Sequence, residues 1–175
     1  MKVICRIKDE DIGQRSIKFL DANPKKGVYG IIQRDDKIAV INVSNRGYYL
    51  LPGGVISEDE DFRSAFINTI NKQTGCKIDI EKVIGAVEEE RCLLRYKQTS
   101  YVYIAKVIEY NEKSIYSEEE KFNDVKIEWI NEDRALTIVA TSYDNLDIDD
   151  AEDLYNIKFN VKKSQAILEE YLKNK

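Results

Sequence analysis

The spacing of hydrophobic and polar residues changes along the chain, and the change separates predicted strands from predicted helices. Residues 2–8 alternate apolar and polar side chains, which is typical of a strand. Segments 28–32 and 38–43 are rich in β-branched residues, and the short polar segment 34–37 joins them. Two such runs with a polar turn between them predict a β-hairpin.

A helical period replaces this pattern in the next part of the chain. Segment 48–51 reads as a further strand, and it leads into Pro52-Gly53-Gly54, where we expect no regular element to continue. From about residue 59 to residue 73, apolar side chains recur at helical spacing. The residues of this stripe are Phe62, Ala65, Phe66 and Ile70. The pattern predicts a central helix with one buried face.

Both ends of this predicted helix carry capping signals. Ser57 and Glu60 fit the Ser-x-x-Glu capping box, in which the two side chains satisfy backbone donors at a helix start. Gly75 follows the last turn as a C-terminal stop. We therefore expect the helix to begin next to this box and to end at the glycine.

The second half of the chain returns to strands and then ends in helices. Predicted strands cover residues 83–87, 92–96, 101–108 and 126–130, and an acid-rich loop at 111–124 separates the last two. Tyr101 and Tyr103 alternate within a strand, so their rings share one face. Such rings either stack on a base or pack under a helix, and we expect packing. Asn131 is a plausible cap for a helix through Val139, and residues 161–173 form a predicted C-terminal helix.

Composition restricts the class of protein. A length of 175 residues suits one domain, and 43% hydrophobic with 34% charged residues is typical of a soluble globular protein. The net charge of -5 argues against broad binding to nucleic acid or to an anionic membrane. No apolar run reaches the length of a membrane span, and the N-terminus does not resemble a signal peptide. We expect a cytoplasmic protein.

Residue usage also limits the chemistry. The chain has no histidine, which removes the commonest general base and most zinc sites. Cys5, Cys76 and Cys92 are widely spaced among apolar neighbours, so we expect free buried thiols. Any hydrolysis by this chain must use carboxylates, lysine, tyrosine or a hard metal ion.

The segment 51–76 resembles the box of the Nudix hydrolases. That motif runs Gly, five residues, Glu, seven residues, then Arg-Glu-apolar-any-Glu-Glu-any-Gly-apolar, and four residues of this chain fall on its frame: Gly54, Glu60, Ile70 and Gly75. The resemblance covers about residues 28–140, with the C-terminal helix at 161–173 consistent with it. It implies a single domain over 1–175 with a Nudix-like α/β/α sandwich: a mixed β-sheet, the box helix after Pro-Gly-Gly, and C-terminal helices.

The same resemblance implies an activity whose key residues are replaced here. Nudix enzymes cut a diphosphate linked to a group such as a nucleoside, and the box glutamates hold magnesium or manganese. The Arg-Glu and Glu-Glu positions are occupied by Asn68, Thr69, Lys72 and Gln73. Compared with three glutamates on one helix face, positions 69, 72 and 73 change the formal charge from -3 to +1. The box is degenerate, so we assign no catalytic residue and expect metal-dependent pyrophosphohydrolase activity to be lost or weak.

Several residues remain candidates for binding. For a phosphorylated or nucleotide-like ligand they are Gly53, Gly54, Glu60, Lys72, Arg91 and Arg95. Resemblance to the family implies that a backbone carbonyl at the glycines helps to bind metal. The loop acids Glu118, Glu119 and Glu120 lie where family members recruit an extra metal ligand, so with Glu60 they are the candidates for a weak magnesium or manganese site.

Three interpretations stay open. In the first, the protein has lost metal catalysis and binds a small phosphorylated or nucleotide-like ligand or a partner. In the second, it is an active Nudix hydrolase with a relocated magnesium or manganese site. In the third, it is a structural or protein-interaction domain, including as a homodimer.

Overall fold

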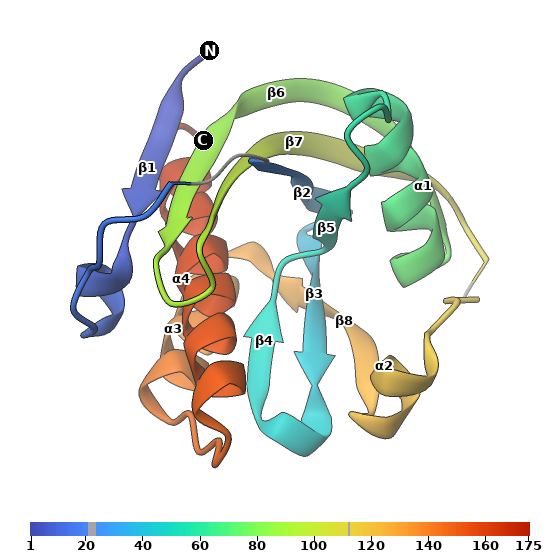
Figure 1. Cartoon of the computed structure of the whole chain (residues 1–175). Coiled ribbons are helices and arrows are strands. Elements are labelled where there is room, and N and C mark those ends of the chain that lie inside the picture. Colours follow the sequence, from blue (N-terminus) through green and yellow to red (C-terminus); the bar gives the residue numbers. More distant parts are fainter. Residues whose placement is uncertain (21–23, 112) are drawn as a thin grey trace.

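The computed structural model describes residues 1–20, 24–111 and 113–175, and within these ranges the strands form one mixed sheet of eight (Figure 1). The main order is β1-β6-β7-β2-β3-β4, while β5 pairs with β2 and β8 pairs with β3. The strands are β1 Val3–Ile7, β2 Lys25–Arg34, β3 Lys37–Val43, β4 Tyr48–Leu50, β5 Gly53–Ile56, β6 Cys76–Arg91, β7 Tyr96–Tyr110 and β8 Val125–Asn131.

Strand β2 joins the two halves of the sheet. It pairs in parallel with β7 from Lys25 to Gln33, and antiparallel with β5 from Lys26 to Tyr29. The β2–β3 hairpin is confirmed, with its turn between Arg34 and Lys37. This pairing places the glycines of the Pro-Gly-Gly segment, at the start of β5, beside the central strand β2.

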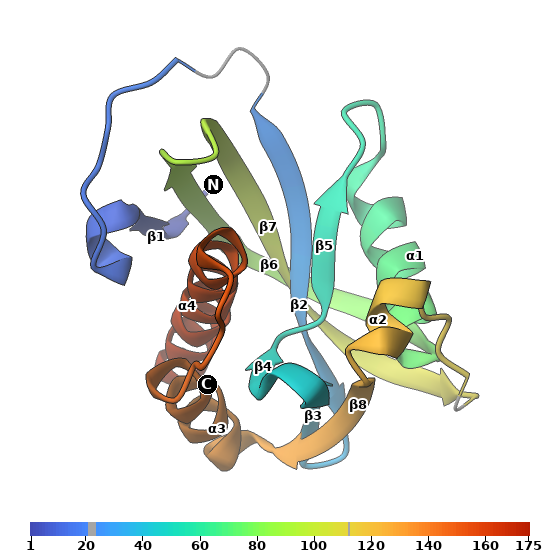
Figure 2. The ribbon, with the colours of Figure 1, turned by 60° about the horizontal axis from the view of Figure 1, so that its bottom comes forward.

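Helices cover both faces of the sheet, as Figures 1 and 2 show. They are α1 Phe62–Thr74, α2 Glu118–Phe122, α3 Glu132–Asp144 and α4 Ala151–Lys173, with short 3-10 turns at Asp9–Ile12 and Ser44–Arg46. Adjacent residues of β2 face opposite layers: Ile32 packs in the core under α1, and Ile31 packs in the core under α3 and α4. This confirms the predicted Nudix-like α/β/α arrangement with C-terminal helices.

Aromatic packing holds α1 on its face of the sheet. The Phe62 and Tyr101 rings lie 4.2 Å apart between centroids, and those of Phe66 and Tyr103 lie 4.6 Å apart. Phe66 is fully buried. The two tyrosines therefore pack under a helix, as their alternation predicted.

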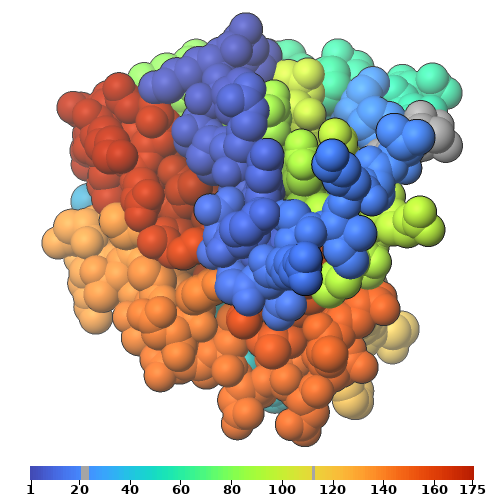
Figure 3. Space-filling model, turned by 60° about the vertical axis from the view of Figure 1, so that its left-hand side comes forward, coloured from blue at the N-terminus to red at the C-terminus, as the bar shows by residue number. Residues whose placement is uncertain are grey.

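The N-terminal segment lies against the C-terminal helix (Figure 3). Tyr155 of α4 donates a hydrogen bond of 2.5 Å from its hydroxyl to the buried carboxylate of Asp9, and the Cys92 N–H donates to the same group at 3.2 Å. Lys2 and Glu170 form an ion pair at the other end of this contact. Among the described residues, no helix is both long and apolar enough to cross a bilayer.

The predicted start of the box helix was wrong. Helix α1 begins at Phe62, and the carboxylate of Asp61 caps it by accepting the Ser64 N–H at 2.9 Å. Ser57 and Glu60 instead form a turn before the helix, with the Glu60 N–H donating to the Ser57 carbonyl at 3.2 Å. Asp61 is the short polar residue nearest the apolar stripe, so it takes the capping role. The C-terminal stop at Gly75 is confirmed, with φ at +70°.

Two strand boundaries also differ from prediction. Strand β5 begins at Gly53, where no regular element was expected, because a glycine backbone at φ +151° fits closely against β2. A Cβ at this position would lie 2.3 Å from the Val28 carbonyl oxygen. Segment 92–96, predicted as a strand, is mostly the turn between β6 and β7, with Arg95 at φ +54°.

Three elements are longer than the sequence pattern suggested. Strand β6 extends over Cys76–Arg91 rather than 83–87, and α3 continues past Val139 to Asp144. Helix α4 begins at Ala151 rather than 161, because Asp150 caps it by accepting the Asp153 N–H at 2.8 Å. The acid-rich loop also contains the short helix α2.

Candidate functional site

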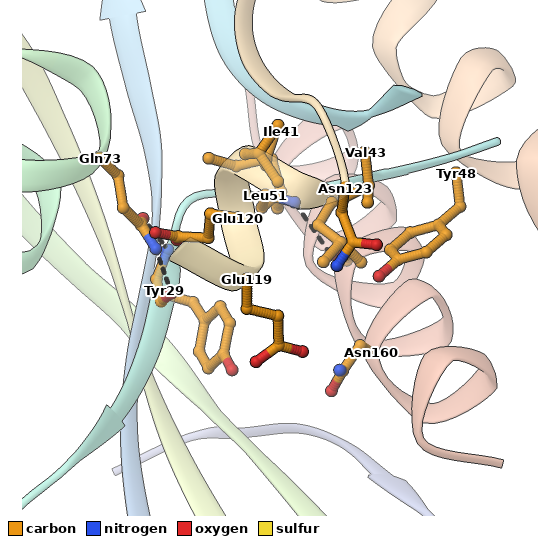
Figure 4. Close-up of a pocket in the computed structure, with 14 residues that line it drawn as sticks. Tyr29, Ile41, Val43, Tyr48, Leu51, Gln73, Glu119, Glu120, Asn123 and Asn160 are labelled. Carbon is orange, nitrogen blue, oxygen red and sulfur yellow. Dashed lines mark hydrogen bonds between the residues drawn. The ribbon is translucent and has the colours of Figure 1, made fainter. Parts of the chain in front are cut away.

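A cavity of about 250 Å³ lies beside the Pro-Gly-Gly segment, between the sheet, α2 and α4 (Figure 4). Strands β2 to β5 form its floor, one side chain comes from the end of α1, and α2 lies across it. Its lining residues are Tyr29, Ile41, Val43, Tyr48, Leu50, Leu51, Gly53, Gln73, Glu119, Glu120, Asn123, Val125, Asn160 and Ser164. The site therefore combines an apolar floor with a few polar groups, which is the usual make-up of a small-molecule site.

Gln73 joins the box helix to the Pro-Gly-Gly segment. The Gly53 N–H donates to Gln73 Oε1 at 2.9 Å, and Gln73 Nε2 donates to the Gly53 carbonyl at 2.9 Å. Figure 4 shows both bonds. A side-chain amide offers both donors, on its NH₂ group, and an acceptor oxygen, whereas an ionised carboxylate offers only acceptors. Gln73 thus matches both backbone groups of Gly53, and we call this pair of bonds the Gln73 clamp.

The other box positions do not point a set of carboxylates at the cavity. Asn68 and Lys72 are exposed, and Thr69 is half-buried. Glu60 is exposed in the turn before α1, where its carboxylate accepts the Ser57 N–H at 3.4 Å, and it is absent from the cavity lining. Gly54 pairs with Val28 of β2 in the strand that leads away from the cavity.

The loop acids divide into three different environments. Glu118 is absent from the cavity lining, is 93% exposed and pairs with Lys121 at 2.9 Å. Glu120 lines the cavity, but its carboxylate accepts the Ser117 N–H at 2.6 Å as the capping box of α2. The Glu119 carboxylate points into the cavity between Tyr29 and Asn160 (Figure 4), and within the described ranges it forms no hydrogen bond or ion pair.

This donor set does not fit a divalent ion held by the box. Over residues 1–20, 24–111 and 113–175, no group of three or more possible acidic or thiol ligands comes together. The cavity offers two carboxylates, one of which is engaged in capping, and the Gly53 carbonyl already accepts a bond from Gln73. Magnesium and manganese prefer several oxygen anions. Glu60 is not brought together with the loop acids.

Arg91 belongs to a buried ionic network behind the cavity wall. Its guanidinium donates to Glu89 at 2.6 Å and to the amide oxygens of Asn156 and Asn160 at 2.7 Å each. Lys163 completes the network by pairing with Glu89 at 2.9 Å. Burial raises the pKa of Glu89, but the charges of Lys163 and Arg91 outweigh burial and hold that pKa below its ordinary value. Arg91 is linked to the cavity through Asn160, whose side chain lines it.

Arg95 lies in another part of the molecule. It lines an open hollow of about 810 Å³ together with Lys8, Lys18 and Lys97, under the N-terminal segment. The structure therefore separates three predicted cations: Lys72 on α1, Arg91 inside the core, and Arg95 in the β6–β7 turn.

Sequence reasoning missed several residues that form the site. Tyr29 and Tyr48 lie on strands with no distinguishing motif, and Asn160 lies in the part of α4 that the pattern left out. Burial raises the pKa of Tyr48; the charge of Arg46 opposes this rise, and those of Asp153 and Glu119 add to it. The burial of Glu89 was predictable, because Glu89 lies two residues after the buried Val87 in β6 and therefore faces the same side of the sheet.

Comparisons with known proteins agree with the fold. No model of a known protein family matches the chain. A curated ADP-ribose pyrophosphatase of Methanocaldococcus jannaschii is 30% identical over 89 residues, which is 49% of this chain and 53% of that protein. The match thus spans about half the length of that relative.

Solved structures of Nudix proteins superpose over most of the chain. A Nudix hydrolase from Nitrosomonas europaea matches with a TM-score of 0.62 at 14% identity, covering 87% of this chain and 91% of that one. An ADP-ribose pyrophosphatase from Streptococcus suis gives 0.52 at 15% identity, covering 84% and 91%. A Nudix-family hydrolase from Clostridium perfringens gives 0.53 at 12% identity, covering 84% and 97%.

The chain has the fold of the Nudix hydrolase superfamily, and the resemblance seen in segment 51–76 is confirmed at that level. The curated pyrophosphatase is a distant relative in sequence, and the solved structures agree with this chain in architecture at low identity.

Proposed function

We propose that this chain is a Nudix-fold protein that binds a small phosphorylated or nucleotide-like molecule beside Gly53, and that the metal-dependent hydrolysis of its superfamily is lost or weak. The observation that carries this proposal is the Gln73 clamp, which occupies the Gly53 backbone with a neutral amide beside a cavity of ligand size. The nucleotide-like ligand is suggested by the similar proteins named as ADP-ribose pyrophosphatases.

Charge at the box supports the loss of metal catalysis. Thr69, Lys72 and Gln73 stand at positions that resemble those of three glutamates, so the helix face carries one positive charge where divalent ions need several negative ones. Loss of a general acid or base alone costs about 100- to 10,000-fold in rate. Loss of a metal that also stabilises the diphosphate costs more.

A second function, hydrolysis with a relocated metal, is favoured by one observation. The short helix α2 brings Glu119 and Glu120 to the same cavity as Gly53. An ion held there would need ligands from the substrate, because the part of the chain that the structure describes supplies two carboxylates to this cavity. This alternative predicts turnover that depends on Glu119.

Assays with ADP-ribose distinguish the two functions. We expect ADP-ribose to bind in isothermal titration calorimetry with the same affinity in EDTA as in magnesium or manganese, and no release of AMP above the blank. Metal-dependent AMP release that disappears in Glu119→Gln would instead establish the relocated site. Absence of binding under all conditions would contradict the proposed ligand.

A restored box tests whether the fold still accepts a diphosphate. The variant combines Asn68→Arg, Thr69→Glu, Lys72→Glu and Gln73→Glu. Its matched control combines Asn68→Arg, Thr69→Gln and Lys72→Gln with Gln73 unchanged, which keeps similar side-chain sizes without the carboxylates. We expect metal-dependent ADP-ribose hydrolysis in the restored variant only. Equal activity in wild type, control and restored chains would show that the box does not limit turnover.

A further inference from the structure

One wall of the cavity beside Gly53 presents hydrogen-bond donors. Asn160 and Ser164 lie one turn apart on α4, so their side chains share a face of the helix, and both line the cavity. We call these two residues the α4 wall. Figure 4 shows Asn160 projecting from α4 toward the space between the helix and the sheet. Arg91 donates to Asn160 Oδ1 at 2.7 Å, and the Leu51 N–H donates to Ser164 Oγ at 3.0 Å.

The donor hydrogens of the α4 wall have no acceptor in the part of the chain that the structure describes. Arginine can only donate, so the bond from Arg91 fixes the orientation of the Asn160 amide and leaves its Nδ2 group free. The Ser164 hydroxyl accepts from the backbone and keeps its own hydrogen for donation. Ser164 is 1% exposed, and a buried donor without an acceptor is costly. A ligand that brings an acceptor would satisfy both groups.

A buried positive charge lies behind these donors. Arg91 and Lys163 share the carboxylate of Glu89, so this network carries one net positive charge, and all three residues are buried. Arg91 reaches the α4 wall through its bond to Asn160. The Lys163 ammonium lies 4.0 Å from the centre of the Tyr29 ring, which also lines the cavity. A negatively charged acceptor would balance the network as well as satisfy the donors.

The two glutamates of α2 do not cancel this charge at the α4 wall. Glu119 is exposed, so water solvates its carboxylate, and the Glu120 carboxylate accepts the Ser117 N–H in the capping box of α2. Water and salt screen exposed charges much more than buried ones. The buried network therefore has the larger effect on a group bound against α4.

We propose that the α4 wall binds an anionic oxygen of a phosphate group, with Asn160 and Ser164 as donors and the Glu89 network as the opposite charge. The proposal rests on the proposed function and deepens it, because it assigns the phosphate end of the ligand to α4. Asn160 is then a specificity-determining residue, since its amide contacts the ligand and Arg91 fixes the direction of its N–H group.

Three small probes test which group the α4 wall accepts. They are inorganic phosphate, acetate, which is an anion of lower charge at neutral pH, and adenosine, which is neutral. Each is titrated into the ¹⁵N-labelled chain in EDTA and followed by nuclear magnetic resonance. We expect phosphate to shift the side-chain amide resonances of Asn160 at the lowest concentration. These resonances are identified by their absence from the spectrum of Asn160→Asp.

Either of the other probes can overturn this assignment. If adenosine shifts the Asn160 resonances at a lower concentration than phosphate does, the α4 wall recognises a neutral group. If acetate is as effective as phosphate, the wall is a general carboxylate site. Both results would contradict the assignment of the phosphate end to α4.

A matched pair of variants separates the Asn160 donor from the charge of the network. Asn156 and Asn160 each accept a bond of 2.7 Å from Arg91, and of the two, Asn160 lines the cavity. Asn160→Asp and Asn156→Asp both cancel the net charge and keep an acceptor for Arg91, so both should fold, which urea denaturation checks. Asn160→Asp also replaces the free N–H donor with a carboxylate oxygen.

The dissociation constant for ADP-ribose in EDTA, measured by isothermal titration calorimetry, should rise in both variants. In Asn160→Asp it should be about tenfold or more higher than in Asn156→Asp, because a charge-assisted hydrogen bond is lost and a like charge takes its place. Equal constants in the two variants would show that Asn160 does not contact the ligand.

Failure of this inference is distinguishable from failure of the proposed function. If ADP-ribose binds wild type and Asn160→Asp equally well, the proposed function stands and the α4 wall is not the phosphate site. If ADP-ribose does not bind wild type but phosphate shifts the Asn160 resonances, the proposed ligand is wrong and the phosphate site stands. If neither ADP-ribose nor phosphate has any effect, both fail.

Discussion

Gln73 is interpreted differently from the sequence and from the structure. In the resemblance to the Nudix motif it stands at a glutamate position, whereas in the fold its amide satisfies the N–H and the carbonyl of Gly53. Sequence reasoning considered only the charge at this position. It had no means of seeing the two hydrogen bonds, because Gly53 and Gln73 come together only when β5 pairs beside α1.

Replacing Gln73 with glutamate should destabilise the protein in metal-free buffer. A carboxylate cannot donate to the Gly53 carbonyl and would repel it, so we expect a loss of about 1–3 kcal/mol in the free energy of unfolding. Urea denaturation measures this change. Lys72→Gln, on the exposed side of the same turn, should change stability by less than about 0.5 kcal/mol. A Gln73→Glu protein as stable as wild type would contradict the role of the clamp.

Glu89 should determine part of the stability in acid. Its pKa is lower in the folded chain than the ordinary 4.5, so its contribution is complete above that value and is lost as the pH falls below it. Glu89→Gln leaves Arg91 and Lys163 buried without an anion, and we expect a loss of about 3–5 kcal/mol at pH 7. Urea midpoints measured from pH 7 down to pH 3 should fall less steeply in this variant than in wild type.

A neighbouring acid provides the control for Glu89. Glu90 is the next residue of β6, is partly exposed, and pairs with Lys97 at 3.6 Å. Glu90→Gln should lower stability by at most about 1 kcal/mol, because exposed ion pairs contribute little. Equal losses in both variants would show that the buried network has no special importance.

At the level of elements, the start of α1 gives a direct test of the corrected cap. Asp61→Ala removes the acceptor of the Ser64 N–H and should lower the urea midpoint of unfolding. Ser57→Ala should leave the midpoint nearly unchanged, because the Ser57 side chain lies outside the helix end. If Ser57→Ala lowered the midpoint more than Asp61→Ala, Ser57 would be the capping residue, as the sequence pattern suggested.

Elements with a regular apolar period were predictable, and those built from charged residues were not. The stripe of α1 and the β2–β3 hairpin follow from side-chain spacing alone. The outer part of β6 carries charged side chains along its exposed positions, so its strand character depends on pairing with β7. The acidic start of α4 resembled a loop because its capping residue, Asp150, lies among other acids.

The site was predictable only where the family resemblance extended to it. That resemblance pointed to the Pro-Gly-Gly segment and to the loop containing Glu119, and both line the cavity. Tyr48 and Asn160 were not predictable, because no local pattern indicates that β4 and α4 meet at this place. Arg91 was a candidate for ligand binding because of its charge, and the sequence could not show its burial, because Asn156 and Asn160, which its guanidinium contacts, lie 65 and 69 residues away along the chain.

At the level of the whole molecule, close packing between the sheet and α1 depends on Gly30. A Cβ there would lie 2.5 Å from Phe66 Cζ and 3.1 Å from the Tyr103 carbonyl oxygen. Phe66 is fully buried, so Gly30→Ala should force α1 and β2 apart and cost about 1–3 kcal/mol. The midpoint of thermal unfolding should be lower for Gly30→Ala than for Gly54→Ala, because a Cβ at Gly54 meets open space. Equal midpoints would mean that α1 adjusts freely.

The origin of the cavity residues has a consequence for folding. Tyr29, Gln73, Glu119 and Asn160 come from four elements that are distant along the chain, so the cavity exists only after the long-range pairings have formed. A ligand that binds only the folded chain would then stabilise the sheet and the helices together, because binding shifts the equilibrium toward the folded state. Hydrogen exchange in the presence of ligand should slow most at amides that open only with global unfolding, far from the cavity as well as beside it.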